Sequence, residues 1–279
     1  MTATPVPVGE QRNSGDDQPD SVLGKAQLLL GAFESGAYQL RLTELSRRSG
    51  VAKASTYRLA QELVRWGLLE RRGDAYQLGT RLFELGQRVP LSAVVRAVAR
   101  PILTDVFTAT GATIHLAVPD GQHVLYLEKI EGESSVHNYS HVGGRLPATC
   151  TATGKVLLAT HAVGADQLES FASSDLPRLT SRSVTSFDEL QRQLAQVRSQ
   201  GFAMEIEETM PRYSSVAVPV VDSSGVVHAA VSATERANRL VIRRVLPELH
   251  RAAAIIAREV PRVMMADFKA VRGPLHAAG

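Results

Sequence analysis

The 279-residue sequence predicts an α+β protein built from two modules. Two observations lead to this prediction. Between residues 22 and 78, three segments with helical spacing are followed by a short pair of alternating segments. Beyond residue 112, alternating segments recur in two pairs, with helical segments between and after them. This order predicts two separately packed modules with a boundary near residue 90.

The first module opens with three expected helices. Residues 22–34 form an apolar opening helix. Thr43 is a suitable N-cap for a second helix, and Gly50 ends that helix because glycine adopts the left-handed conformation at little cost. A third helix over residues 53–66 follows a tight turn and ends before Gly67. Its buried side is predicted to carry Leu59, Leu63, Val64 and Trp66.

A basic hairpin follows the third helix. Residues 68–70 and 75–78 alternate as two strands, and the turn between them, 71–74, carries Arg71 and Arg72. Helix, turn, helix and hairpin in this order are typical of a winged helix-turn-helix, which binds duplex DNA. The alternative interpretation is a solvated three-helix module that holds a partner protein.

The unburied side of the third helix carries cationic, hydroxyl and aromatic side chains, which suit phosphate oxygens and base edges in a major groove. The two hairpin arginines suit a backbone or minor-groove contact. We predict that the DNA-binding residues are Arg47, Lys53, Ser55, Thr56, Tyr57, Arg58, Arg71 and Arg72.

Positive charge is concentrated in this first module. Residues 21–88 contain eleven basic and six acidic side chains, a net charge of +5, whereas the whole chain carries +3. The rest of the chain is therefore slightly acidic. Such a distribution raises the electrostatic contribution to DNA affinity without making the second module bind nucleic acid.

Composition excludes several other classes of protein. No apolar run approaches the roughly 18 to 20 residues that cross a bilayer, and residues 1–20 lack the apolar core of a secretory signal, so we expect a cytoplasmic protein without membrane contact. Residues 1–20 are polar and are expected to form a disordered tail. The single cysteine, Cys150, excludes an intramolecular disulfide and a thiol metal cage. No cofactor and no metal site are predicted.

The second module is expected to contain an antiparallel sheet flanked by helices. Residues 80–94 suggest a linker helix with a break near Pro90. The expected hairpins pair 113–118 with 123–130 and 215–221 with 226–234. The expected helices cover 153–162, 187–200 and 241–265, with Pro247 and Pro261 marking a bend and a fraying end of the last one.

Several motifs occur in an order that resembles the IclR family of bacterial transcriptional regulators. They are Gly79-x-Arg81-x-x-Glu84-Leu85-Gly86, Leu146-Pro147-Ala148, Ala152-Thr153-Gly154-Lys155, Gly201-Phe202-Ala203 and Ser215-Val216-Ala217-Val218-Pro219-Val220. The resemblance runs from about residue 21 to about residue 262. It implies a winged helix-turn-helix joined by a linker helix to a GAF-like effector-binding domain, without catalytic residues, in a homodimer or dimer of dimers on a palindromic operator.

Domain boundaries follow from this resemblance. Residues 1–20 are expected to be a tail, 21–79 the DNA-binding domain, 80–94 the linker helix, 95–265 the effector-binding domain and 266–279 a second tail. A repressor that its ligand releases from DNA is favoured over an activator. Lys53-Ala54-Ser55 stands where Lys-Ser-Thr is common in the family, so the operator sequence does not transfer.

The resemblance also implies an effector pocket. Its residues would be Ala152, Thr153, Gly154, Glu205, Ser215, Ser232 and Thr234, with Cys150 as a small buried or pocket-lining thiol. Free N–H groups and the positive end of the dipole at the helix start near Thr153 attract a carboxylate. We therefore expect a small organic acid, with an aromatic carboxylate as one candidate and another small metabolite as the alternative.

Two pocket positions depart from the family pattern. Glu205 stands where a shorter acid is common, and Ser215 replaces a frequent cysteine. A negative charge on Glu205 opposes an anionic ligand unless Glu205 pairs with Arg145, meets a ligand hydroxyl or becomes protonated.

Several single residues allow other interpretations. An enzyme, either a hydrolase or a transferase, would use Cys150 as nucleophile beside a histidine at 115, 137 or 141. His137 and His141 would share one face of a strand but lack a third metal ligand. Lys155 lacks the glycine-rich loop of a nucleotide site, which favours helix-end packing or an ion pair.

Overall fold

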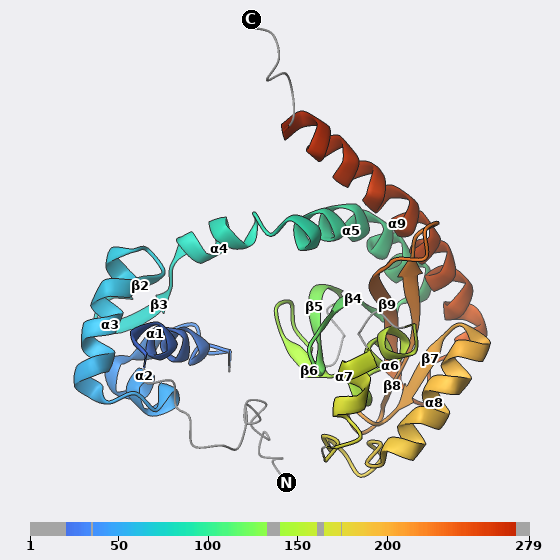
Figure 1. Cartoon of the computed structure of the whole chain (residues 1–279), viewed down its shortest axis with the longest axis horizontal. Helices are drawn as coiled ribbons and strands as arrows, with labels where there is room; N and C mark the ends of the chain where they lie inside the picture. The colour runs from blue at the N-terminus through green and yellow to red at the C-terminus, as the bar shows by residue number, and fades with distance from the viewer. Residues whose placement is uncertain (1–20, 35, 133–139, 161–164, 174, 272–279) are drawn as a thin grey trace, which may run out of the picture. The chain divides into compact units, whose positions relative to one another are not determined.

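The computed structural model describes residues 21–34, 36–132, 140–160, 165–173 and 175–271 (Figure 1). The chain divides into two compact units between Val89 and Pro90. The tail expected over residues 1–20 lies outside the described residues, as does the tail expected over 266–279 from residue 272 onward, whereas residues 266–271 are helical.

The first unit is a three-helix core with a small sheet. Its helices are α1 (Val22–Gly31), α2 (Leu42–Ser49), α3 (Lys53–Arg65) and α4 (Thr80–Gly86), and its strands are β1 (Leu40–Arg41), β2 (Leu69–Arg72) and β3 (Ala75–Leu78). The strands lie in the order β1-β3-β2, and both pairs are antiparallel. The core residues include Leu29, Phe33, Leu45, Leu59, Leu63 and Tyr76. The predicted helix, turn, helix and hairpin are all present.

Local details of this unit differ from the sequence prediction. Helix α2 begins at Leu42, with Arg41 rather than Thr43 as its N-cap, because Arg41 is paired in β1 and the chain passes directly from strand to helix. The hairpin turn is shorter than expected, since Arg71 and Arg72 belong to β2 and only Gly73 and Asp74 turn.

The predicted linker helix over residues 80–94 is two helices. Helix α4 ends at Gly86, and α5 (Pro90–Thr110) begins at Pro90. Proline has no N–H to donate and its ring presets a helical φ, so it suits the first turn of a new helix. The break expected near Pro90 therefore separates two helices and coincides with the division between the units.

The second unit is built on a six-stranded antiparallel sheet. In chain order it contains β4 (Thr113–Asp120), β5 (His123–Ile130), β6 (Arg145–Pro147), a 3-10 turn (Ala148–Cys150), α6 (Ala152–Ala159), α7 (Ala165–Ser170), α8 (Phe187–Gln200), β7 (Ala203–Ile206), β8 (Tyr213–Val221), β9 (Val227–Arg236) and α9 (Ile242–Val271). The strand order is β6-β5-β4-β9-β8-β7. Both predicted hairpins are present, β4 with β5 and β8 with β9.

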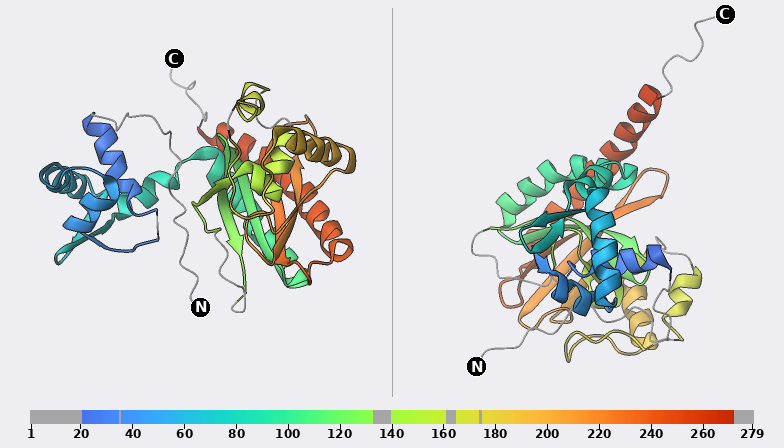
Figure 2. Two further views of the ribbon diagram at one scale, coloured as in Figure 1. Left: turned by 90° about the horizontal axis from the view of Figure 1, so that it is seen from below. Right: turned by 90° about the vertical axis from the view of Figure 1, so that its left-hand side faces the viewer.

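Strand alternation gives the sheet two different faces. Helices α5 and α9 cover one face (Figure 2). Branched side chains of this face form the larger core. That face carries Ile114, Leu116, Val216, Val218 and Val231. Helices α6 and α8 cover the other face, which carries the small residues Ala117, Ala217 and Ala230. Small side chains leave room for α6 to lie close to the sheet.

Two helices of this unit have ends that the sequence did not predict. Helix α6 begins one residue before Thr153, because the Thr151 hydroxyl accepts a hydrogen bond from the Gly154 N–H at 3.0 Å and so caps the helix. Helix α9 continues through Pro261 to Val271 rather than ending near residue 265. Proline removes only one backbone hydrogen bond, and Val260, which is fully buried in the core, keeps this turn in place.

The predicted fold class, α+β with a winged helix-turn-helix and an antiparallel sheet domain flanked by helices, is confirmed. No helix within the described ranges has the length and apolar character needed to span a bilayer.

Candidate functional site

Helix α3 exposes part of the predicted DNA-binding face. Lys53, Tyr57 and Arg58 are exposed, and Ser55 is half-buried. Neither Lys53 nor Arg58 is paired with an acidic side chain among the described residues, so both cations are free for phosphate oxygens or base edges.

Thr56 does not belong to this face. Its side chain is fully buried, and its hydroxyl donates to the Val51 carbonyl at 2.9 Å and to the Ala52 carbonyl at 3.2 Å. The prediction that Thr56 contacts DNA is therefore wrong. Thr56 stands three and four residues before the buried Leu59 and Ala60, a helical spacing that places it on the interior side.

Trp66 was predicted to be buried and is instead exposed to 70%. Helix α3 ends at Arg65, and Trp66 is its C-cap residue with non-helical backbone. Helical spacing no longer specifies where a side chain points once the helix has ended.

The remaining predicted arginines are exposed, but acidic or carbonyl groups hold them. Glu44 accepts from Arg47 through Nε at 2.9 Å and Nη2 at 2.6 Å, and it accepts from Arg48 Nε at 2.6 Å. These hydrogen bonds, those of Arg47 first, lower the pKa of Glu44 to about 2. At the hairpin, Arg71 Nε donates to the Gly73 carbonyl at 3.0 Å and Arg72 pairs with Glu70 at 3.1 Å.

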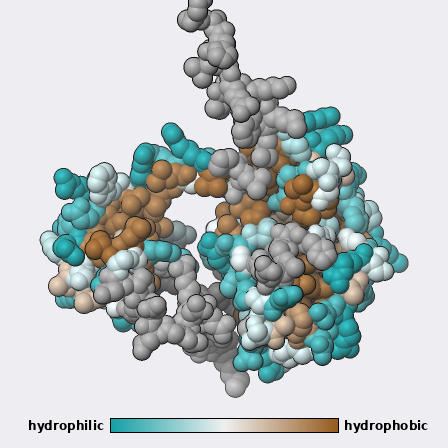
Figure 3. Space-filling view, in the orientation of Figure 1, coloured by the Kyte–Doolittle hydropathy of each residue, from teal (hydrophilic) through white to brown (hydrophobic). Residues whose placement is uncertain are grey.

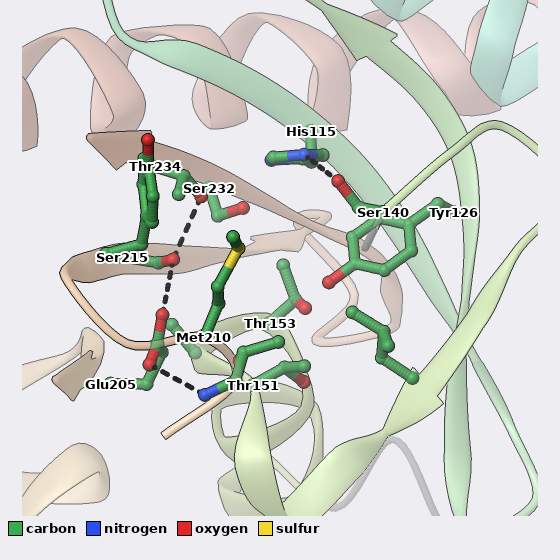
Figure 4. A pocket seen from close by; sticks show the side chains of 14 residues that line it. His115, Tyr126, Ser140, Thr151, Thr153, Glu205, Met210, Ser215, Ser232 and Thr234 are labelled. Atoms are coloured by element: carbon green, nitrogen blue, oxygen red, sulfur yellow. Dashed lines mark hydrogen bonds between the residues drawn. The ribbon is translucent and has the colours of Figure 1, made fainter. Parts of the chain in front are cut away.

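The second unit contains a cavity on the α6 side of its sheet (Figure 4). It measures about 410 Å³, counting the space at its mouth. The lining residues are mostly polar and come from the start of α6, from all six strands of the sheet, from Ser140 and from the segment after β7. They are His115, Tyr126, Ser140, Leu146, Thr151, Ala152, Thr153, Glu205, Thr209, Met210, Tyr213, Ser215, Ser232 and Thr234.

Strand register places three of these polar side chains in one row. Ser215 of β8 lies opposite Glu205 of β7 and opposite Thr234 of β9. The Ser215 hydroxyl donates to Glu205 Oε1 at 2.8 Å, and Ser215 Oγ lies 2.9 Å from Thr234 Oγ1. On the other side, Glu205 Oε2 accepts from the backbone N–H groups of Glu208 at 2.9 Å and Thr209 at 3.4 Å.

Burial changes the titration of Glu205 and His115. Removal from water raises the pKa of Glu205 to about 7, against the opposing hydrogen bond from Ser215. Removal from water also lowers the pKa of His115 to about 3, with a smaller contribution from Lys129, so the imidazole is neutral at physiological pH. The alternative in which Arg145 neutralises Glu205 is wrong, because Arg145 pairs with Asp120.

Two buried polar atoms at the cavity make no hydrogen bond of ordinary geometry with the described residues, although the Tyr126 hydroxyl interacts with Thr153. They are Thr153 Oγ1 at the start of α6 and His115 Nδ1 on β4, whose other ring nitrogen lies 2.7 Å from Ser140 Oγ. Buried polar atoms are normally paired, so these two atoms and the first N–H groups of α6 mark the cavity as a site for a polar ligand.

A buried ion pair supports the row of polar side chains from behind. Lys155 Nζ of α6 lies 2.5 Å from Glu208 Oε1, and both side chains are buried. The Ser183 hydroxyl donates to the Glu208 carbonyl at 2.7 Å. These contacts hold the backbone of residue 208, whose N–H binds Glu205. Lys155 is thus an ion-pair residue, the alternative favoured over nucleotide binding.

Two predicted effector residues, Cys150 and Gly154, do not line the cavity. Cys150 is fully buried in the 3-10 turn, and its Sγ donates to the Pro177 carbonyl at 3.2 Å. A β-carbon at Gly154 would lie 2.2 Å from the Ala148 carbonyl oxygen, so Gly154 allows close packing of α6. The other predicted residues, Ala152, Thr153, Glu205, Ser215, Ser232 and Thr234, are brought together around the cavity.

Sequence reasoning missed the aromatic and histidine side of the cavity. His115 lies opposite Ser232 in the sheet and packs its ring against Tyr126 at 5.2 Å between centroids. Alternation with the buried Ala117 could have indicated that His115 faces the α6 side. Tyr126, Thr209, Met210 and Tyr213 carry no local signal, because the pairing of distant segments brings them to the cavity.

The alternatives based on Cys150 and on histidine pairs find no support in this geometry. Burial raises the pKa of the Cys150 thiol, which opposes a nucleophilic thiolate. His141 lies in a turn rather than on a strand, and His137 lies outside the described residues. In the part of the chain that the structure describes, no group of three or more metal-ligating side chains occurs.

A winged helix-turn-helix with free cations, combined with a separate unit that encloses a polar cavity, defines the class of ligand-binding transcriptional regulators. The family models for the IclR helix-turn-helix domain and for the bacterial transcriptional regulator IclR C-terminal match residues 22–73 and 88–262. The chain belongs to the IclR family of bacterial transcriptional regulators, which are DNA-binding proteins rather than enzymes.

Individual proteins of known name are similar over most of the chain. The transcriptional regulator XynR of Escherichia coli is 34% identical over 77% of this chain and 86% of its own length. The regulator KdgR of Escherichia coli is 32% identical over 88% of this chain and 95% of its own length. A crystal structure of an IclR homologue from Microbacterium hydrocarbonoxydans, complexed with 4-hydroxybenzoate, is 31% identical, covers 87% of this chain and 100% of that chain, and has a TM-score of 0.80.

Proposed function

We propose that this protein is a regulator whose affinity for its DNA operator changes when a small organic acid binds in the cavity of the second unit. The observation that carries this proposal is that two buried polar atoms at the cavity, His115 Nδ1 and Thr153 Oγ1, make no hydrogen bond of ordinary geometry within the described residues, and that Thr153 lies at the start of α6. A helix start with an adjacent hydroxyl can complete the hydrogen bonding of a carboxylate.

An aromatic acid is the favoured ligand within this class. Tyr126, Met210 and Tyr213 supply a partly apolar wall, which suits the ring of such an acid. The similar Microbacterium hydrocarbonoxydans protein was crystallised with 4-hydroxybenzoate. A sugar acid, whose hydroxyls would meet the serine and threonine side chains, is the alternative.

For the DNA interface we propose Lys53, Tyr57 and Arg58 as the contacts of α3, with Ser55 at the edge. We also propose Arg47, Arg71 and Arg72 as phosphate contacts, because an acidic or carbonyl group already fixes the orientation of each side chain. The proposed DNA-binding domain is residues 21–79, and the proposed effector-binding domain begins with α5 at Pro90.

The first unit also exposes a large amount of apolar surface, which supports a homodimer or a dimer of dimers. Figure 3 shows apolar surface on this unit and over α4, and its large exposed apolar residues include Leu23, Trp66, Leu78, Phe83 and Leu85. Exposed patches of this kind on a soluble protein usually mark an interface. Pairing through the first units would place two α3 helices on one DNA face.

Direct binding measurements test the proposal. DNA ligands are first selected from a random library by the purified protein, and fluorescence anisotropy then gives Kd with and without 4-hydroxybenzoate. A ligand acts only through unequal affinity for two states, so we expect the acid to weaken DNA binding, as in a repressor that its ligand releases. Tighter binding with the acid would show an activator-like response. Unchanged Kd across a panel of small acids would overturn the proposal.

A further inference from the structure

The row Glu205, Ser215 and Thr234 is a chain of hydrogen bonds with a direction. Ser215 lies between a carboxylate oxygen at 2.8 Å and the Thr234 hydroxyl at 2.9 Å, and Thr234 lines the cavity. Each hydroxyl has one proton to donate and two lone pairs to accept with. The protonation state of the group at one end of such a row therefore decides whether the hydroxyl at the other end donates a hydrogen bond to a ligand or accepts one.

The backbone fixes which oxygen of Glu205 can carry a proton. Oε2 already accepts from the N–H groups of Glu208 and Thr209, so it must remain an acceptor. Oε1 faces only Ser215 among the described donors. A proton on Glu205 is consequently placed on Oε1 and donated to Ser215.

Protonation of Glu205 therefore reverses the direction of both hydrogen bonds in the row. When Glu205 is ionised, Ser215 donates to Glu205 and Thr234 donates to Ser215, so Thr234 presents only lone pairs to the cavity. When Glu205 is protonated, Glu205 donates to Ser215 and Ser215 donates to Thr234, so the Thr234 proton points into the cavity. The first state suits a ligand that donates a hydrogen bond, and the second suits a carboxylate oxygen.

We propose that Glu205 is the specificity-determining residue of the effector site, and that a carboxylate bound between the start of α6 and Thr234 places one oxygen against Thr234 and is accompanied by one proton that Glu205 takes up. This inference rests on the proposed function, since it concerns the same cavity.

The groups around Glu205 favour this proton uptake. Glu208, from the segment after β7, raises the pKa of Glu205 further, because two negative charges lie close together, and Lys155 of α6 is already paired with Glu208. His115 of β4 is neutral, and burial raises the pKa of Tyr126 on β5. Tyr213 of β8 also lines the cavity. No described cation therefore pairs with Glu205, and a proton is the available means of neutralising it when an anion enters.

The test is titration calorimetry with 4-hydroxybenzoate at pH 6, 7 and 8, each in two buffers with different ionisation enthalpies. With a pKa near 7, we expect uptake of about 0.9 proton per site at pH 8 and about 0.1 at pH 6, and Kd about tenfold weaker at pH 8. A wild-type Kd that is independent of pH, without proton uptake, would overturn the inference and leave the proposed function standing.

Glu205→Gln should fix the hydrogen bonds permanently in the direction that they take when Glu205 is protonated. The two backbone N–H groups require the amide oxygen on their side, so the amide N–H₂ faces Ser215 and donates to it. We expect this variant to bind 4-hydroxybenzoate with one Kd from pH 6 to pH 8 and with no proton uptake. The matched control is Glu235→Gln, one residue beyond Thr234 and therefore on the opposite face of the sheet, which should behave as wild type.

Thr234→Val distinguishes an effect that passes through the row of hydrogen bonds from a direct electrostatic effect of the Glu205 charge. Valine has the shape of threonine, and the hydrogen bond from Ser215 to Glu205 stays. We expect weaker binding and loss of proton uptake, because the ligand no longer contacts the chain. Full uptake in this variant would mean that the charge of Glu205 acts directly through space, which would overturn the inference. This variant also provides the test if Glu205→Gln fails to fold.

A neutral probe of matched shape, 4-hydroxybenzyl alcohol, distinguishes failure of the inference from failure of the proposed function. In one outcome no acid binds, while the alcohol binds more tightly at pH 8 and releases a proton at pH 6. The row of hydrogen bonds then acts as proposed, and the proposal of an acid as the ligand is wrong. If neither probe binds at any pH, both proposals fail.

Discussion

At the scale of single residues, exposure rather than chemical type separates the side chains of α3 that can contact DNA from those that hold the helix in place. Arg58 and Thr56 are two residues apart, and both suit DNA by chemical type. Arg58 is exposed, whereas Thr56 donates to two backbone carbonyls inside the unit. The two positions therefore predict opposite outcomes on substitution.

Arg58→Ala should weaken DNA binding. Loss of a phosphate contact reduces the dependence of log K on log salt by about 1, and loss of a base contact costs about 1 to 3 kcal/mol. Anisotropy titrations on the selected DNA at several salt concentrations give both values. The control is Arg192→Ala, an exposed arginine of α8 in the second unit. Equal effects of the two substitutions would show that only net charge matters.

Thr56→Val should lower the free energy of unfolding by about 1 kcal/mol, because it removes a buried hydroxyl and leaves its acceptor carbonyls with fewer donors. Urea unfolding measures this change. The salt dependence of DNA binding by the folded variant should equal that of wild type, and a reduced slope would return Thr56 to the DNA interface.

Glu205 makes stability depend on pH. Its pKa is about 7 when folded and 4.5 as the ordinary value, so the folded state holds the proton more tightly. Wild-type stability should therefore be complete below about pH 4.5 and fall as the pH rises to about 7, by at most about 3 kcal/mol. Glu205→Gln lacks this loss, so its stability relative to wild type should increase between pH 5 and pH 8 in urea unfolding. A constant difference would contradict the raised pKa.

At the scale of elements, the contact between α6 and the segment after β7 positions the effector site. This contact is a buried ion pair between Lys155 and Glu208, which are far apart in the sequence. Removing one partner of a buried pair leaves a charge without compensation, whereas removing both leaves an apolar contact.

Lys155→Met should therefore lower the free energy of unfolding by about 3 to 5 kcal/mol, and the double variant Lys155→Met, Glu208→Leu should lose considerably less. Urea unfolding of both single variants and the double variant closes the cycle. If the double variant is no more stable than Lys155→Met, the pair contributes through something other than its charges.

Local sequence signals predicted some of the helices and strands but not others. The helices of the first unit, α8 and both hairpins follow from spacing and turn residues, because these depend on neighbours along the chain. The start of α2 and the division of the expected linker helix did not follow. In the first case β1 pairs with a distant strand, and in the second Pro90 begins a helix instead of interrupting one.

At the scale of the whole molecule, pairing of two first units would set the geometry of the operator. Two α3 helices related by a twofold axis read half-sites about one helical turn apart, a separation of about 34 to 36 Å. Inserting about 5 base pairs between the half-sites turns one of them to the opposite side of the duplex.

We therefore expect this insertion to weaken binding by more than tenfold in anisotropy titrations, while moving or scrambling the flanking sequence has no effect. An operator that binds equally well after the insertion would indicate that the two DNA-binding units are not held in one fixed arrangement. Sedimentation velocity on the free protein supplies the oligomeric state.

The sequence by itself determined the two modules, the order of their elements, the family and most of one wall of the cavity, because spacing, capping and turn residues act between chain neighbours. Only the tertiary structure decided that Cys150 and Gly154 pack outside the cavity and that His115 and Tyr126 complete it. The physical reason is that burial and strand register depend on residues far apart in the chain. The same register joins Glu205, Ser215 and Thr234 into one hydrogen-bonded row.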